Sequence, residues 1–424
     1  MSFIRFCLLL SSGYWPDRDD REWNMHENRR RIGQLLALSW LTAVGRAVVA
    51  PLLVLTLGRR LGLASAEIGL LLGAVLLSAT LSSLYLGYLV DRFNRRRLMS
   101  LALSLVAVGF ALIPVSSGVG MAACGLLLVE GAFSLFGIAA KAALSDLLPP
   151  ASRGRLFSLR YTLVNIGFAI GPFIGSLLME KDPAWPFWLA SALLLSGLPL
   201  LRGLPGRAAA AGARPAGFAA TLRVLGRDRV LLLFILGSLL AYMVHGRFAD
   251  YLSMYLLKTH DDATVLRWMS ALILTNALVV VTLQYPLGRW MRQRHLLRWI
   301  ALSSLLLAAS MLGFAHSGTL FAWCAWMAVF TLGEVIIIPA EYLYVDALAP
   351  EALKGSYYGA HSLAFVGSAA NPVLSGLMLA ALPAPALLWT LAGACLLGLA
   401  LVRRAERLRR GEEACRAAPD AVAG

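Results

Sequence analysis

Charged residues are scarce in this sequence. They make up 14% of its 424 residues, against about 25% in an ordinary globular domain, while 59% of the residues are hydrophobic. Apolar runs of about 20 residues, the length that crosses a bilayer, recur along the whole chain. The alternating pattern of a membrane barrel is absent. We therefore expect an all-α, polytopic membrane protein and exclude a soluble domain.

Cysteine is rare as well, and its spacing excludes two further classes. The five cysteines show no CxxC or other ligand spacing, which argues against a disulfide framework and a metal site. They are Cys7, Cys124, Cys324, Cys395 and Cys415. The sequence also lacks GxSxG, HExxH and phosphate-binding glycine loops. We expect no enzyme activity, no cofactor and no metal.

The apolar runs predict twelve spans and five segments. The expected spans are residues 33–57, 67–90, 98–117, 119–147, 158–179, 184–203, 230–257, 266–290, 296–315, 318–347, 357–381 and 384–402. They divide the chain into a tail (1–32), a six-helix half (33–203), an Arg/Pro/Gly-rich linker (204–229), a second half (230–402) and a tail (403–424). The short apolar stretch at residues 3–15 lacks a cleavage site, so we expect a tail there and no cleaved signal peptide.

Basic residues mark one side of the membrane. The net charge is +15, and 30 of the 38 Lys and Arg fall in the tails, in the loops after even-numbered spans or at the span ends that adjoin these loops. This bias predicts that both termini and the linker are cytoplasmic. The clusters lie between spans, where they suit anionic lipid headgroups, so we expect a lipid bilayer as partner and no nucleic acid.

An internal repeat relates the two halves at an offset of 201 residues. Gly45-Arg46 recurs as Gly246-Arg247, Gly87 as Gly288, Arg153-Gly154 as Lys354-Gly355, and Gly175 as Gly376. Four matches at one offset, each in the corresponding span, predict a duplication. Two six-helix halves of this kind are typical of transporters that rock around a central site.

Ionisable residues within the spans are candidates for function, because a charge at bilayer depth costs about 3 kcal/mol and needs a partner or a wet cavity. Glu130 and Glu334, in spans 4 and 10, are candidate proton carriers. A satisfied hydrogen bond between helices is the alternative for both. Arg46 and Arg247 are candidate cavity charges. Asp250 can pair with Arg247 one helical turn away, which is the structural alternative, and it is a third proton candidate.

The stretch "GYLVDRFNRRR" concentrates charge directly after span 2. Its members are Gly87, Asp91, Arg92, Asn94, Arg95, Arg96 and Arg97. This pattern resembles the cytoplasmic signature of the major facilitator superfamily, with Asn94 in place of glycine. Asparagine tolerates the left-handed conformation that ends a helix, so we expect the turn to survive. The resemblance implies a gate: Asp91 would cap the start of span 11, and Arg95 would reach Asp146 at the end of span 4.

The stretch "NIGFAIGPFIGSLL" in span 5 places Gly167, Gly171, Pro172 and Gly175 on one helix. Small residues at this spacing let helices approach closely, and close packing alone is one interpretation. The combined GxxxGPxxG also resembles the antiporter signature of the superfamily's drug:proton exporters, with Ser176 in place of a final glycine. Span 4, however, lacks the arginine that many of these antiporters carry and has Glu130 nearby.

Together with "RGRLFSLR" and "RVLGRDRVLLLF", these motifs resemble bacterial multidrug-efflux transporters of the MdtH type. The resemblance implies the twelve-helix major facilitator fold, in two pseudo-symmetric halves, in a bacterial inner membrane. We expect a monomeric secondary transporter that exports small amphipathic compounds against protons. An importer or facilitator of a nutrient or organic anion with the same fold is one alternative, and a non-transporting sensor or scaffold is another.

Overall fold

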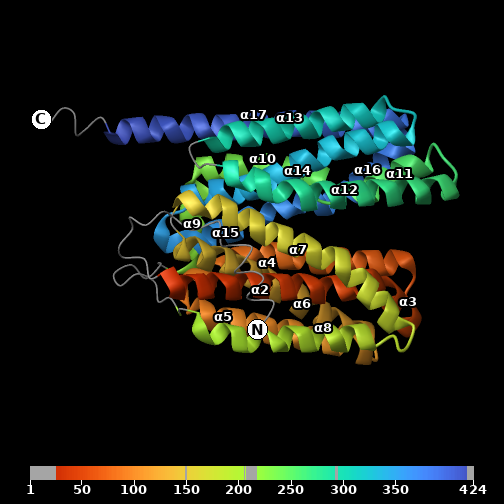
Figure 1. Ribbon diagram of the computed structural model, residues 1–424, viewed down its shortest axis with the longest axis horizontal. Coiled ribbons are helices and arrows are strands. Elements are labelled where there is room, and N and C mark those ends of the chain that lie inside the picture. Colours follow the sequence, from red (N-terminus) through yellow and green to blue (C-terminus); the bar gives the residue numbers. More distant parts are fainter. Residues whose placement is uncertain (1–24, 149, 205, 207–216, 292–294, 418–424) are drawn as a thin grey trace, which may run out of the picture. The chain divides into compact units, whose positions relative to one another are not determined.

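Figure 1 shows a computed structural model of the chain, which describes residues 25–148, 150–204, 206, 217–291 and 295–417. All regular structure in these residues is helical. Among the described residues, eleven helices are long and apolar enough to cross a membrane, and a bent pair in span 7 makes twelve when it counts as one span. The predicted all-α fold is confirmed. Parts of three predicted segments lie outside the described residues: most of the N-terminal tail, residues 207–216 of the linker and the end of the C-terminal tail.

The first six spans are built from seven α-helices and two 3-10 turns. These are α2 (Met25–Val49), η2 (Ala50–Leu52), α3 (Leu53–Leu61), α4 (Ser65–Arg92), α5 (Arg95–Val115), α6 (Val119–Leu147), α7 (Pro150–Met179), α8 (Trp185–Ser196) and η3 (Leu198–Gly203). We expected each span to be a single α-helix, and two of these six spans are not. Span 1 is interrupted at residues 50–52 and span 6 ends in a 3-10 turn; a proline stands in each interruption, where it removes a backbone donor.

The second six spans follow a short helix in the predicted linker, α9 (Phe218–Arg227). They are α10 (Arg229–His245), α11 (Phe248–Leu257), α12 (Asp262–Trp290), α13 (Leu296–Ala315), α14 (Leu320–Leu348), η5 (Glu351–Leu353), α15 (Lys354–His361), η6 (Ser362–Ala364), α16 (Phe365–Ala381) and α17 (Ala384–Ala417). Two differences from the expected spans stand out. Span 11 is broken at residues 362–364, and the last helix continues to Ala417, well past residue 402.

Polar side chains fix where several helices begin. Asn94 accepts a hydrogen bond from the Arg97 amide at 3.2 Å and caps α5. Asp228 does the same for α10 through the Leu231 amide at 2.9 Å. The expected left-handed turn at Asn94 is wrong: its φ is −62° and its ψ is 111°. The residue starts the next helix through its side chain, so it does not need the conformation that ends the previous one.

Span 7 bends by 48° at Gly246 and Arg247, between α10 and α11. A bend leaves the last carbonyls of α10 without intrahelical donors. The carbonyl of Met243 instead accepts a hydrogen bond from the Asn371 amide of α16. The Ser375 hydroxyl donates to Oδ1 of the Asn371 side chain at 2.8 Å and orients that side chain. The bend is thus stabilised by a side chain from span 11.

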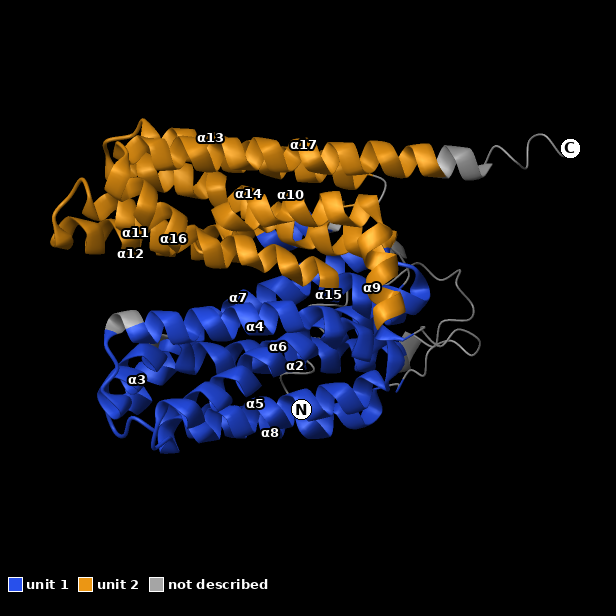
Figure 2. Ribbon diagram, turned by 180° about the vertical axis from the view of Figure 1, so that it is seen from behind, with its two compact units in different colours: residues 1–218, 284–289, 349–359 blue, residues 219–283, 290–348, 360–424 orange. Residues whose placement is uncertain are grey.

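The chain divides into two compact units, coloured separately in Figure 2. Unit 1 contains residues 1–218, 284–289 and 349–359; unit 2 contains 219–283, 290–348 and 360–424. Within unit 1, α5 packs on α6 and α8, and α2 packs on α7 and α8. Within unit 2, α13 packs on α14 and α17, and α10 packs on α16 and α17. The same pairs of spans are therefore in contact in each half, as a duplication requires.

Candidate functional site

One end of unit 1 gathers the charged motif of loop 2–3. Asp91, in the last turn of α4, accepts hydrogen bonds from the amides of Gly355 at 2.6 Å and Ser356 at 2.7 Å. The Ser356 hydroxyl donates to it as well, at 2.7 Å. Both amides belong to the first turn of α15, where unpaired N–H groups and the helix dipole favour a carboxylate. The contact expected between Asp91 and the start of span 11 is present.

Glycine allows this contact. A Cβ atom at Gly87 would lie 2.5 Å from the Gly355 carbonyl oxygen, and one at Gly355 would lie 2.8 Å from Asp91 Oδ1. Any larger residue at either position would push α4 and α15 apart. The two glycines therefore set the short distance across which Asp91 reaches the backbone of α15.

Arg95 begins α5 and is buried, with 5% of its side chain exposed. It forms an ion pair with Asp146 near the end of α6 and donates to the Ala142 carbonyl at 2.9 Å. Lys354 Nζ lies 3.8 Å from the other Asp146 oxygen and donates to the Ser145 hydroxyl at 2.8 Å. Asp146 thus joins spans 3 and 4 to the start of α15. We call Asp91, Arg95, Asp146 and Lys354 the loop cluster.

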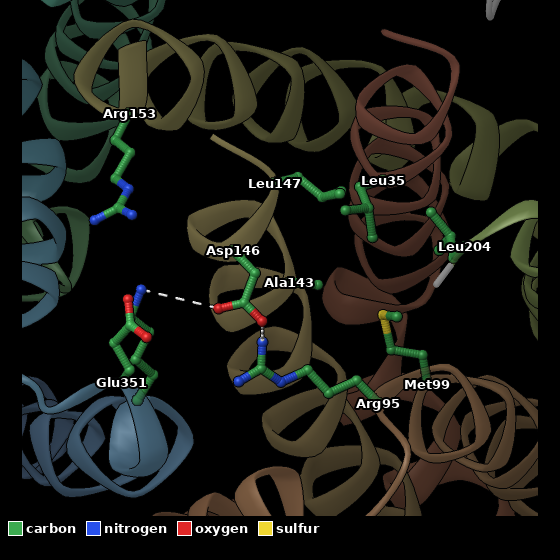
Figure 3. Close-up of a pocket in the computed structure, with 10 residues that line it drawn as sticks. Leu35, Arg95, Met99, Ala143, Asp146, Leu147, Arg153, Leu204 and Glu351 are labelled. Carbon is green, nitrogen blue, oxygen red and sulfur yellow. Dashed lines mark hydrogen bonds and ion pairs between the residues drawn. The ribbon is translucent and has the colours of Figure 1, made fainter. Parts of the chain in front are cut away.

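The loop cluster borders a cavity of about 390 Å³ (Figure 3). Arg153 and Glu351 lie on the polar side of this cavity, and Leu35, Met99 and Leu204 lie on the opposite side of Asp146. The three other arginines of the motif do not line it. Arg92 donates to the hydroxyl of Tyr88, and Arg96 and Arg97 are exposed.

A second charged contact lies near the middle of α6. Arg46 Nη2 of α2 lies 2.8 Å from each carboxylate oxygen of Glu130. The side chains remain 38% and 20% exposed, and the Phe133 ring lies 5.2 Å from the guanidinium carbon. The sequence indicated both charged residues separately. Their pairing was missed, because 84 residues separate them and no local spacing relates them.

Glu334, the counterpart acid in α14, has an amide as a partner. Asn276 of α12 donates to Glu334 Oε2 at 2.8 Å and to Thr331 Oγ1 at 3.0 Å. Glu334 is 9% exposed. The interhelical hydrogen bond weighed as an alternative is therefore present here. Sequence reasoning missed Asn276, whose only signal was an amide in an otherwise apolar run.

Arg247 and Asp250 pair with each other, as their spacing indicated. The Arg247 Nε and Asp250 Oδ2 atoms are 2.6 Å apart, and the side chains are 48% and 37% exposed. The pair stands at the bend of span 7, where α10 ends and α11 begins. It is therefore local to one span, unlike the pair of Arg46 and Glu130.

The glycines of span 5 pack against span 1. A Cβ atom at Gly167 would lie 2.9 Å from the Ala43 side chain, and Cβ atoms at Gly171 and Gly175 would overlap Ala47 and the Val48 carbonyl oxygen. Pro172 stands between these contacts and cannot donate to the carbonyl one turn earlier. The close-packing interpretation of the motif describes its geometry; its role in antiport stays a prediction.

Residues 35–370 match the Major Facilitator Superfamily, which accounts for most of the chain. The chain belongs to this superfamily. The uncharacterised MFS-type transporter YdeE of Escherichia coli is 35% identical over 86% of this chain and 92% of its own. Multidrug resistance protein MdtH of Edwardsiella ictaluri is 29% identical over 78% of this chain and 82% of its own. A Na(+), Li(+), K(+)/H(+) antiporter of Planococcus maritimus is 25% identical over 83% of this chain and 89% of its own.

Solved structures of MFS transporters share the fold at low sequence identity. FucP in its outward conformation superimposes with a TM-score of 0.72 at 16% identity, over 88% of this chain and 98% of that one. The human organic anion transporter MFSD10 gives 0.67 at 20%, over 88% and 99%. The chain is thus a multi-pass MFS secondary transporter that binds a small-molecule substrate, and it is not an enzyme. The predicted resemblance is confirmed.

Proposed function

We propose that this MFS transporter exports small amphipathic compounds in exchange for protons by alternating access. The observation that carries the proposal is the pair of Arg46 and Glu130, an ion pair between spans 1 and 4 whose two side chains are 38% and 20% exposed. A pair that is neither fully buried nor fully solvated can be opened by a proton or by a ligand. Transport coupling needs a group of this kind.

The chemistry of the pair follows from its charges. While Glu130 is ionised, it holds the guanidinium of Arg46 through two contacts of 2.8 Å. A proton on Glu130 removes this attraction because it neutralises the carboxylate. The neutral carboxyl group is also far cheaper to keep in an apolar span than a bare charge. Arg46 is then free to change partner. Proton uptake and a rearrangement between spans 1 and 4 would thereby be one event.

Glu334 is the second candidate for the same role, and Asp250 the third. Glu334 accepts a hydrogen bond from Asn276, and an amide supports either protonation state because it can also accept from a carboxyl group. Arg247, paired with Asp250, stays a candidate cavity charge. The name of one relative, an antiporter of alkali cations and protons, supports antiport as the reaction type, and the name of another, a multidrug resistance protein, supports drugs as substrates.

The loop cluster serves this cycle as a conformational latch. Asp91 holds the start of α15 through three hydrogen bonds, and Arg95 holds Asp146. None of these contacts needs a substrate. We infer that they stabilise one state of the transporter and open in another, so that the latch biases two states that differ by a few kcal/mol.

We further propose a monomer in a bacterial inner membrane, with both termini and the linker cytoplasmic. The bacterial relatives and the charge bias between loops support this arrangement. Single cysteines in a variant whose native cysteines are replaced test it. A cysteine in residues 204–229 should resist an impermeant maleimide added to whole cells, whereas one in the loop after span 1 should react. The reverse pattern would contradict the orientation.

The function is tested in liposomes with the purified protein and ethidium as a lipophilic cation. We expect an imposed pH gradient to drive ethidium movement, and ethidium movement to release protons in return. The same vesicles are then tested with Na⁺, with K⁺ and with a small organic anion. If movement of an alkali cation is coupled to protons, the function is cation antiport and the proposal of drug export is wrong. Uncoupled movement of the anion would favour a facilitator, and no movement of any probe would contradict the proposed function.

A further inference from the structure

Three ionisable side chains that the proposed cycle does not use lie buried in unit 2. They are His245 of α10, Glu341 of α14 and His361 of α15. The His361 Nε2 and Glu341 Oε2 atoms are 3.5 Å apart, and the two side chains are 1% and 2% exposed. The His245 ring packs on Tyr242 at 4.6 Å, and the Tyr242 ring lies 6.4 Å from that of His361.

The polar atoms of this group are unsatisfied. Both ring nitrogens of His361, the facing Oε2 atom of Glu341 and Nε2 of His245 are buried and form no hydrogen bond within the described part of the chain. Leaving such groups unpaired in an apolar interior costs about 1–3 kcal/mol each. A proton on His361 Nε2 would turn the 3.5 Å contact into a charge-assisted hydrogen bond after a small side-chain rotation.

The surroundings leave Glu341 as the acid that faces His361. The Phe234 ring stacks at 5.6 Å from the imidazole, and the Tyr342 ring stands edge-on at 6.4 Å. Beyond Phe234, Tyr344 donates to Glu406 of α17, and Glu406 is also bound by Arg409 and Arg410.

The remaining neighbours add little charge. The sequences of η6 and α16 contain no ionisable residue, and α10 contributes Arg229 at its start besides Tyr242 and His245. The other acids of α14 are Glu334, which is bound by Asn276, and the buried Asp346. The described residues also contain no group of three or more His, Cys, Asp or Glu arranged to hold a metal ion. The unsatisfied atoms therefore fit a proton as ligand.

We propose that His361 and Glu341 form a proton-binding site, with His245 as its neighbour, separate from the sites at Glu130 and Glu334. One proton taken from solution binds to His361 Nε2 and changes the charge of the pair from −1 to 0. His361 is the last residue of α15, whose first turn is capped by Asp91. Protonation at one end of this helix therefore acts on the element that the latch holds at the other.

The site is tested by NMR of ¹⁵N-labelled histidine rings in nanodiscs, without gradient or substrate. The chain has six histidines, and His361→Gln identifies the signal. We expect this ring to change between its neutral and protonated forms within about pH 5–8. The change should be lost from that range in Glu341→Gln and kept in Glu130→Gln and Glu334→Gln. If His361→Gln does not fold, single variants of the other histidines assign the signal by elimination.

The exposed His316 at the end of α13 provides the control. His316→Gln should leave the titration of the His361 signal unchanged. An additional readout is the exchange of labelled for unlabelled ethidium at equal pH on both sides. Its dependence on pH should be lost in Glu341→Gln, while a gradient still drives net movement. A His361 ring that keeps one form across the range, or that titrates identically in Glu341→Gln, would overturn the proposal and leave the proposed exporter untouched.

Discussion

In the first half, Glu130 of α6 is held by a guanidinium from α2, whereas in the second half Glu334 of α14 is held by an amide from α12. The repeat offset of 201 residues aligns Glu130 with Thr331 and Phe133 with Glu334. The acid has therefore moved by one helical turn between the halves. Phe133, which aligns with Glu334, contacts Arg46, the partner of Glu130. Thr331, which aligns with Glu130, contacts Asn276, the partner of Glu334.

The shift changes the chemistry more than the packing. A guanidinium is permanently charged and can only donate hydrogen bonds, so it favours an ionised Glu130. An amide is neutral and can donate or accept, so it tolerates either form of Glu334. The two corresponding halves thus hold their acids under different electrostatic conditions. We infer from this comparison that Glu130 and Glu334 have different roles in coupling.

The largest expected effect comes from removing the proposed proton sites. Glu130→Gln and Glu334→Gln keep the shape of the side chain and cannot carry a proton. We expect at least one of them to reduce ethidium movement driven by a pH gradient to background, because coupling requires a titrating group. Vesicle transport at several gradients measures this loss.

Asp262→Asn, at the exposed start of α12, is the control and should transport like the parent. If Glu130→Gln alone loses coupling, the halves have diverged in function as well as in chemistry. Should both Gln variants keep full gradient-driven movement, the assignment is wrong, and Asp250 is the next residue to replace.

The glycines of spans 5 and 11 lie in different surroundings, and this difference should appear in the stability of the protein. A methyl group at Gly175 would overlap the Val48 carbonyl oxygen of α2, whereas no atom lies within 4 Å of a Cβ at its counterpart, Gly376. We expect Gly175→Ala to destabilise the protein by about 1–3 kcal/mol through overpacking. Gly376→Ala should be neutral or stabilise it by about 0.5–1 kcal/mol. Thermal unfolding in detergent measures both, and equal midpoints for the two variants would contradict the close approach of α7 to α2.

The contact made by Asp91 in the loop cluster differs between the halves. Gly87 and Gly288 both stand at close approaches, Gly87 to Gly355 and Gly288 to Ser158. The counterpart of Asp91 by the same offset is Arg292, which lies outside the described residues. The carboxylate cap therefore belongs to one half only.

Asp91→Asn leaves one side-chain acceptor for the three donors that Asp91 now binds. We expect this to weaken the latch by about 1–2 kcal/mol. Transport should slow because the balance of conformations shifts, while the affinity for substrate stays nearly unchanged. Spin-label distances and substrate binding measure the two effects. A variant with collapsed affinity and an unchanged distribution of distances would move Asp91 into the binding site.

The smallest expected effect is at the start of span 8. Asp261 caps α12 by accepting from the Thr264 amide at 3.1 Å, while its counterpart helix, α4, follows Ala64, which has no side-chain acceptor. The hydrogen bonds from Thr264 hold the pKa of Asp261 below its usual value of 3.8. The stabilisation is therefore present at neutral pH and is lost as the pH falls through the lowered value.

Asp261→Ala should lower the unfolding midpoint slightly at pH 7, and the difference from the parent should vanish in acid. Asp261→Asn keeps an acceptor without a titrating group, so it should match the parent at pH 7. A difference for Asp261→Ala that grows as the pH falls would contradict the cap.

Sequence patterns predicted the parts of this molecule that depend on local chemistry. Twenty-residue apolar runs give the spans because a bilayer accepts backbone polar groups only when they are paired within the segment. The contacts of Asp91 with span 11 and of Arg95 with Asp146 are not local, and they were expected only because the Gly87 motif resembles the superfamily signature. The spacing of Arg247 and Asp250 gave their pair.

The missed features depend on which helices become neighbours. Arg46 and Glu130 are 84 residues apart, and Asn276 and Glu334 are 58 apart. No periodicity within one span relates such residues. Residues 362–364 include no proline or glycine from which the break could have been predicted. Asn94 was assigned to the end of one helix, whereas its side chain starts the next. Tertiary contacts decided the two side-chain pairs, whereas the Asn94 cap is a local hydrogen bond with the Arg97 amide.

The bend of span 7 has a consequence for how the protein is made. Its Met243 carbonyl is satisfied by Asn371, a residue 128 positions later. Synthesis proceeds from the N-terminus, so span 7 enters the membrane long before Asn371 exists. A carbonyl without a donor costs several kcal/mol in lipid, and a straight helix avoids this cost. We expect span 7 to insert straight and to bend only when span 11 arrives, so that a chain truncated after span 10 should keep span 7 straight, and Asn371→Leu should straighten span 7 in the full-length chain.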